Sequence, residues 1–92
     1  MDSYLIIIES GPKNFSAFSP DVPGCVTVGD TVDETLAYMR DALQGHLQDE
    51  EHIPEPKGIE WHFRNDPTLG SDQSLIFAYI PVEEVAPALA HA

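Results

Sequence analysis

The sequence predicts a small α+β domain with the element order β-β-β-α-β. Three observations support this prediction: short apolar and β-branched runs separated by turns, then one amphipathic helix pattern, then a last apolar run. The first three strands form an antiparallel meander, and the helix acts as a crossover that places the fourth strand parallel to the third. The length of 92 residues fits a single domain, 1–92, in which the Pro- and Gly-punctuated segment 52–74 is irregular.

The predicted strands follow from composition and turn chemistry. Residues 4–8 and 75–80 are apolar on both alternating faces, as in strands from the middle of a sheet, so we expect them to be neighbours. Residues 15–18 and 25–28 are shorter strands, separated by a loop with two prolines and a glycine. Gly29 ends the third strand, and Pro81 ends the fourth because proline has no N–H for a strand ladder.

The helix is predicted over 31–50 and must end before Pro54. Thr31 and Glu34 form a capping box, in which each side chain accepts a hydrogen bond from an unpaired backbone amide at the helix start. Apolar residues then recur on one helical stripe: Val32, Leu36, Met39, Leu43 and Leu47. Tyr38 lies off this stripe, where an aromatic side chain is suited to an interface.

One helix can cover only one face of such a sheet. The other face then carries one of two apolar sets: Tyr4, Ile6 and Ile8 with Leu75, Phe77 and Tyr79, or Leu5 and Ile7 with Ile76, Ala78 and Ile80. Monomers rarely leave a patch of this kind in water. We therefore expect a homo-oligomer, a dimer or a higher assembly.

Charge narrows the function classes. Sixteen acidic residues against four basic ones give a formal charge of -12. This is the wrong sign for direct nucleic-acid binding, which depends on neutralising phosphates, and it favours a basic protein partner. The longest apolar run is far too short for a membrane span. A single cysteine, Cys25, and no visible export signal favour a reducing, cytoplasmic setting.

The sequence gives no basis for assigning an enzyme. Cys25 reads as a small core residue rather than a nucleophile. His46, His52 and His62 have no recognised metal-ligand spacing, and no phosphate-binding glycine loop is present. We therefore predict no catalytic residues, no metal and no cofactor. A small metal-dependent hydrolase that uses these histidines with nearby acids is the less favoured alternative.

The run 18–36, FSPDVPGCVTVGDTVDETL, resembles the signature of the HicB-like antitoxin family. The resemblance joins a Pro-Asp-x-Pro-Gly-Cys turn, a short strand and a Gly-Asp-Thr helix start, and Ile53-Pro54-Glu55-Pro56 after the helix also fits. It implies a partial ribonuclease H-like fold and a non-catalytic antitoxin that binds a small basic RNA-cleaving toxin of the HicA type. Many members carry a DNA-binding segment after this domain, for which we expect no counterpart here.

The predicted partner-binding residues lie on and just after the helix: Tyr38, Asp41, Asp49, Glu50 and Glu51. Their acids would face the basic toxin and help to cover its RNA-binding surface. An orphan HicB-like interaction or regulatory module, without a toxin, is the other alternative.

Overall fold

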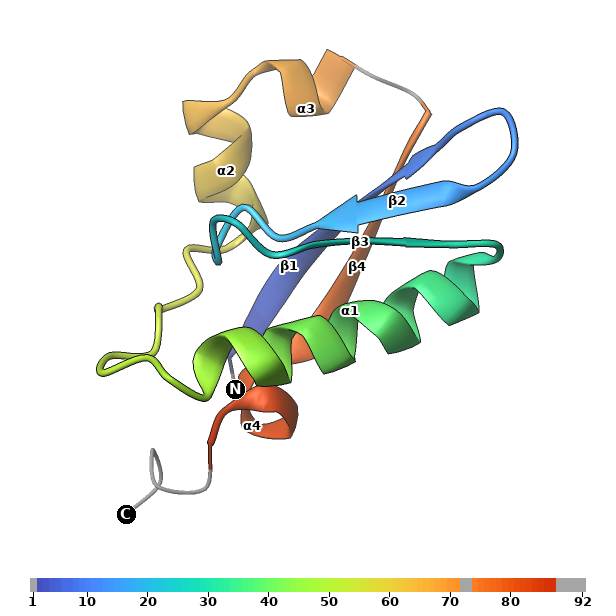
Figure 1. The fold of residues 1–92 in the computed structure, drawn as a ribbon. Coiled ribbons are helices and arrows are strands. Elements are labelled where there is room, and N and C mark those ends of the chain that lie inside the picture. The colour runs from blue at the N-terminus through green and yellow to red at the C-terminus, as the bar shows by residue number, and fades with distance from the viewer. Residues whose placement is uncertain (1, 72–73, 88–92) are drawn as a thin grey trace.

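The computed structural model describes residues 2–71 and 74–87, which form a four-stranded sheet with helices on both faces (Figure 1). The strands lie in the order β3-β2-β1-β4. Their bounds are β1 Ser3–Ser10, β2 Phe15–Phe18, β3 Val26–Gly29 and β4 Leu75–Pro81. The helices are α1 Val32–Leu47, α2 Ile59–Asn65, α3 Thr68–Ser71 and α4 Val82–Val85.

The meander and the β1–β4 neighbourhood are confirmed, but the direction predicted for the fourth strand is wrong. β4 is antiparallel to β1, with Tyr4 opposite Ile80 and Glu9 opposite Leu75. Because β1 and β3 both run antiparallel to β2, β4 is also antiparallel to β3. The right-handed crossover rule applies to a strand, a helix and a parallel strand in direct succession. Here α2 and α3 follow α1, and they carry the chain to the opposite end of the sheet before β4 begins.

The α1 face of the sheet holds the larger core. The buried side chains on this face come from alternate positions of β1 and meet those of α1, in the cluster Tyr4, Ile6, Ile8, Ala17, Met39, Leu43, Leu47 and Ile80. The antiparallel register places Ile76, Ala78 and Ile80 opposite Ile8, Ile6 and Tyr4. Both apolar sets predicted from the sequence therefore combined the wrong halves of the two strands. The observed register puts the even-numbered positions of both strands on one face, and a shift of one residue would exchange the two sets, so hydrophobicity at every position gave no signal for the register.

The second face is also covered by this chain, contrary to the prediction of an open apolar face. Leu5 and Ile7 are at most 1% exposed, and they pack against Leu69 of α3. Ile59 and Phe63 of α2 join the same cluster, and the Phe63 ring lies 5.4 Å from that of Phe77. Segment 52–74 was predicted to be irregular, yet it contains two short helices that close this second core.

The capping box at the start of α1 is confirmed. The Thr31 hydroxyl accepts from the Glu34 amide at 3.0 Å, and the Glu34 carboxylate accepts from the Asp30 amide at 2.9 Å. The helix ends at Leu47 with Gln48 as its C-cap, a few residues earlier than expected. Met39, Leu43 and Leu47 are fully buried, so the apolar stripe is confirmed as the face of α1 that packs on the sheet.

The last helix that the structure describes, α4, is one turn long, Val82–Val85, and residues 88–92 fall outside the described residues. No helix in the part of the chain that the structure describes has the length and apolar character to cross a membrane.

Candidate partner-binding surface

The solvent-facing side of α1 carries the first two predicted partner-binding residues. Tyr38 is 45% exposed, and Asp41 lies three residues further along the helix and is also exposed. Residues three apart on a helix are neighbours on its surface, so the phenol ring and the carboxylate form one small patch. This patch pairs an aromatic side chain with an acid, a combination suited to a basic partner.

A second flank of α1 is occupied by α4. Arg40 forms an ion pair with Glu84 at 2.9 Å, and the Gln44 amide donates to the Glu84 carbonyl at 3.1 Å. These contacts use one of the four basic side chains of the protein to fix α4 against α1. Arg40, the residue before Asp41 on α1, is therefore already paired with an acid of this chain.

The remaining predicted residues, Asp49, Glu50 and Glu51, follow the end of α1 and are all exposed. Glu50 approaches His46 at 3.5 Å, one helical turn earlier. Tyr38 and Leu47, the last residue of α1, are already about 13 Å apart along the helix axis at 1.5 Å per residue, and Asp49 lies beyond that end, so the five residues do not form one compact site. They divide into the Tyr38–Asp41 patch and an acidic segment at the far end of α1.

A pocket that the sequence did not reveal lies next to this acidic segment. It has a volume of about 340 Å³. Its lining combines apolar surface with three carboxylates and no lysine or arginine: Asp2, Ile53, Pro54, Glu55, Pro56, Val82 and Glu83. The chain runs from Glu51 directly into this lining. We call Asp49, Glu50, Glu51 and this pocket the acidic end of the molecule.

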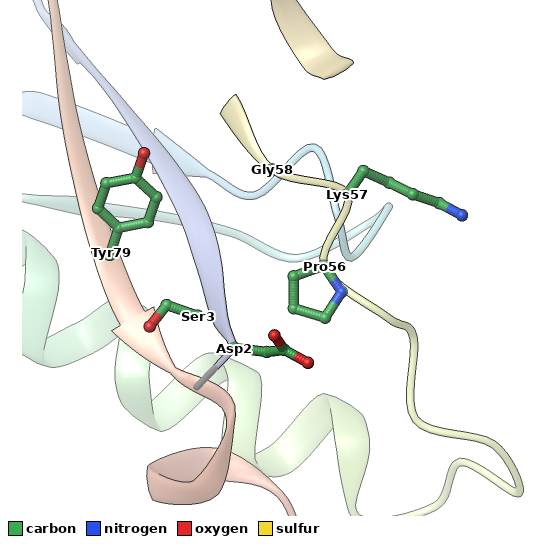
Figure 2. A pocket seen from close by; sticks show the side chains of 6 residues that line it. All are labelled: Asp2, Ser3, Pro56, Lys57, Gly58 and Tyr79. Atoms are coloured by element: carbon green, nitrogen blue, oxygen red, sulfur yellow. The ribbon is translucent and has the colours of Figure 1, made fainter. Parts of the chain in front are cut away.

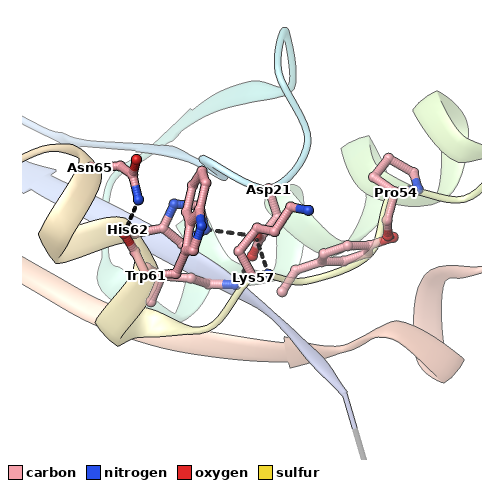
Figure 3. A network of polar contacts seen from close by, with 8 residues as sticks. Asp21, Pro54, Lys57, Trp61, His62 and Asn65 are labelled. Carbon is pink, nitrogen blue, oxygen red and sulfur yellow. Dashed lines mark hydrogen bonds and ion pairs between the residues drawn. The ribbon is translucent and has the colours of Figure 1, made fainter.

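Asp21 is the centre of a buried polar network that sequence reasoning also missed (Figure 3). Its carboxylate accepts from the Leu5 amide and from the Lys57 amide, each at 2.9 Å. The third contact is with His62 Nε2 at 2.6 Å. An ionised carboxylate can only accept, so Nε2 carries the proton in this contact. One side chain thereby connects β1, the loop before β3 and the segment that leads into α2.

Asp21 lies where the hydrogen-bond ladder between β1 and β2 has ended. Leu5 points its amide toward β2, but the β1–β2 pairing ends at Ile7 opposite Phe18. A buried amide left without a partner costs about 1–3 kcal/mol, and the Asp21 carboxylate supplies that partner. The Pro-Asp-x-Pro-Gly turn therefore positions an acceptor for the first residues of the central strand. In the sequence, Pro20, Asp21 and Pro23 indicated only a rigid loop.

Tyr4 connects the acidic end to the core through a hydrogen bond. Its side chain is fully buried, and its hydroxyl donates to the Pro54 carbonyl at 2.7 Å, on the wall of the pocket. Burial, with the Asp21 charge as a second cause, raises the pKa of Tyr4 from 10.0 to about 12. The protonated hydroxyl is therefore favoured in the folded protein.

This shift predicts a loss of stability in alkali. A pKa that is higher in the folded state gives stability that is complete below pH 10 and is lost as the pH rises to about 12. The expected loss across that window is about 2–3 kcal/mol in the free energy of unfolding, since each pKa unit corresponds to 1.36 kcal/mol. Denaturant titrations at successive pH values measure it. Tyr4→Phe should be less stable at neutral pH and lose less between pH 10 and 12, and an unchanged slope in this variant would contradict the assignment.

The residues considered for chemistry lie in separate environments. Cys25 is buried, and burial raises the pKa of its thiol, as expected for a core residue. His46 faces Glu50, His62 is bound to Asp21, and His52 is exposed. Within residues 2–71 and 74–87, no group of three or more His, Cys, Asp or Glu residues is placed to hold a metal ion.

A comparison with protein-family models identifies one family. The family model described as HicB_like antitoxin of bacterial toxin-antitoxin system matches residues 4–86. A relative from Haemophilus phage HP1, described as an uncharacterized 14.9 kDa protein in the rep-hol intergenic region, is 36% identical over 61 residues. The matched stretch covers 62% of this chain and 46% of the phage protein, so the chain spans about half of that relative.

Solved structures show the same fold. A chain from a HicA3 and HicB3 toxin-antitoxin complex matches with a TM-score of 0.63 and 24% identity, covering 84% of this chain and 93% of its own. A crystal structure of antitoxin HicB3 gives 0.67 and 20%, covering 94% of this chain and 68% of its own. The antitoxin HicB of Burkholderia pseudomallei gives 0.65 and 18%, covering 95% and 69%. From the family match over 4–86, with these folds in agreement, the chain belongs to the HicB-like antitoxin family of bacterial toxin-antitoxin systems.

Proposed function

We propose that this chain is the antitoxin of a toxin-antitoxin pair and neutralises a small, basic, RNA-cleaving toxin of the HicA type by binding to it. The family supports the antitoxin role, and a structural match comes from a complex of HicA3 with HicB3. The observation that carries the proposal is the acidic end, where exposed carboxylates continue into a pocket without a lysine or arginine in its lining. A toxin that binds RNA must present positive charge, and this surface complements it.

The pocket suits a lysine or arginine side chain from the toxin. The aliphatic stem of such a side chain would lie against Ile53, Pro54 and Val82, while its charged head would lie near Glu55 and Glu83. Basic side chains engaged in this way would no longer be available to RNA. Neutralisation is then steric and electrostatic and needs no catalysis by this chain, in keeping with a cytoplasmic partner of the toxin.

The alternatives gain less support. Of the histidines proposed for a hydrolase, His46 faces Glu50 and His62 faces Asp21, and no group of three or more potential ligands is placed to hold a metal ion in the described residues. An orphan module would have the same fold but no toxin, so a binding experiment separates it from the proposal. The formal charge of -12 continues to argue against direct binding of nucleic acid by these residues.

Exchange of two acids tests the proposal. Glu50→Gln with Glu51→Gln should weaken binding of the full chain to its HicA-type toxin about three- to tenfold, mainly through slower association, with a reduced salt dependence. Surface plasmon resonance measures both rates, and co-expression with the toxin measures rescue of growth. The same exchange should leave the melting temperature equal or slightly raised, because these carboxylates lie at the negative end of the α1 dipole.

The matched control is Glu9→Gln with Glu60→Gln, which removes the same charge from exposed positions on β1 and α2. Equal weakening by both pairs would mean that only net charge matters and would refute the acidic end as the binding surface. Glu55→Gln with Glu83→Gln tests the pocket separately. A wild-type chain that neither binds nor rescues would refute the antitoxin proposal itself.

A further inference from the structure

Residues 53–57, which we call the strap, form a wall of two neighbouring pockets. The first four residues of the strap line the pocket of the acidic end. A second pocket, of about 560 Å³, lies between the start of β1, Tyr79 of β4 and the end of the strap (Figure 2). Asp2 and Pro56 belong to the lining of both pockets, so the position of the strap affects the shape of each.

The strap has no regular secondary structure to hold it in place. It lies between α1 and α2, and in the part of the chain that the structure describes, no hydrogen bond between two backbone groups involves residues 53–57. Pro54 and Pro56 also lack the N–H group with which to form one. A segment of this kind keeps a single position only when other groups hold it.

Two buried side chains hold the backbone of the strap. The Tyr4 hydroxyl donates to the Pro54 carbonyl at 2.7 Å, and the Lys57 amide donates to Asp21 Oδ1 at 2.9 Å. The side chains of Tyr4 and Asp21 are both fully buried. The other oxygen of Asp21 accepts from the amide of Leu5, the residue after Tyr4. Both attachments therefore connect the strap to the same point of β1.

Glu55 lies between these two attachments, with a proline on each side. Each proline fixes its own φ angle, so this part of the strap is stiff. A stiff segment that is held near both ends has little freedom to rotate about its length, and the direction of the Glu55 side chain follows from it. Tyr4 and Asp21, which are not among the pocket-lining residues, thereby set the placement of a carboxylate that is.

We propose that Tyr4 and Asp21 are positioning residues for toxin binding, which hold the strap so that Glu55 and Glu83 face the same incoming basic side chain. This inference rests on the proposed function, because it requires the pocket of the acidic end to receive the toxin. A strap that is already ordered avoids the entropy cost of ordering on binding, so it raises affinity without a new contact. Neither positioning residue touches the toxin.

Tyr4→Phe tests this role, because it keeps the aromatic ring and removes only the hydroxyl. The full chain with this change should bind its HicA-type toxin about three- to tenfold more weakly, as measured by isothermal titration calorimetry at neutral pH. Ile8→Val is the matched control. It removes one buried carbon from the same face of β1, farther along the strand, and lowers stability through packing alone, so it should bind like the wild type.

A double-mutant cycle shows whether Tyr4 acts through Glu55. Glu55→Gln alone should weaken toxin binding, and adding Tyr4→Phe should weaken it by no more than about a further twofold, because the strap no longer presents a carboxylate. The losses in the free energy of unfolding should add, since Glu55 is exposed. A hydroxyl that only stabilises the fold would give additive losses in affinity as well, and that result would overturn the inference.

Amide hydrogen exchange of the free protein gives a readout that needs no toxin. In Tyr4→Phe the Lys57 amide should exchange faster, and its increase should exceed that of the Leu43 amide in the core. Equal increases at these amides, or wild-type toxin affinity in Tyr4→Phe, would overturn the inference and leave the antitoxin proposal standing. A wild-type chain that does not bind the toxin would refute the antitoxin proposal, and the positioning role with it.

Discussion

Asp21→Asn is expected to lower the free energy of unfolding by about 1–3 kcal/mol or more, the cost typical of leaving a buried hydrogen-bond donor without its acceptor. The reason is the number of donors around Asp21. Both carboxylate oxygens accept, one from Leu5 and the other from Lys57 and His62. An asparagine offers one oxygen and one NH₂ group, so at least one donor would face another donor in a buried site.

Urea denaturation followed by circular dichroism measures this loss. Asp41→Asn is the matched control, since it makes the same chemical change at an exposed position of α1 and should alter stability by no more than about 0.5 kcal/mol. Hydrogen exchange should also show faster opening of the region around α2, which Asp21 connects to β1. An Asp21→Asn variant as stable as the control would show that the network contributes little.

Gly29→Ala is expected to cost about 1–3 kcal/mol or more, because the added methyl group has no space. A Cβ at this position would lie 2.5 Å from Thr35 Oγ1, 2.9 Å from the Thr35 amide nitrogen and 3.0 Å from its Cα. Thr35 is held in place, since both its amide and its hydroxyl donate to the Thr31 carbonyl. The first turn of α1 cannot move away without disturbing its cap.

Gly45→Ala is a control that should raise the free energy of unfolding instead of lowering it. Nothing lies within 4 Å of a Cβ at Gly45, and alanine is favoured over glycine inside a helix by about 1 kcal/mol, so this variant should be more stable. Adding Thr35→Ala to Gly29→Ala should restore only part of the loss, because the backbone contacts remain. Full restoration would place the whole effect on the Thr35 side chain, and no loss at Gly29 would contradict the close approach of β3 and α1.

The local elements were largely predictable. The capping box of Thr31 and Glu34, the apolar stripe of α1 and the strands around 4–8 and 75–80 all depend on short-range patterns that the sequence states directly. The burial of Cys25 and the exposure of Tyr38 are confirmed for the same reason, since both follow from the position of a residue within one element.

The errors came from long-range relationships. The direction of β4 depends on where segment 48–74 carries the chain, and neither α2 nor α3 has a strong periodic pattern of its own. Once that segment was taken as irregular, one face of the sheet, left open between the two alternate sets of positions, was expected to need a second copy. In the structure, Leu69 and its neighbours cover that face.

By itself, the sequence determined the kind of domain, its strongly acidic character and the family signature around 18–36, because composition and turn or cap motifs are local properties. The tertiary structure alone decided the antiparallel position of β4, the meeting of Asp21 with His62 and the pocket at the acidic end. Each of these joins residues that are far apart in the chain. Their contacts depend on how packing and backbone hydrogen bonding are satisfied over the whole sheet, which no single stretch of sequence specifies.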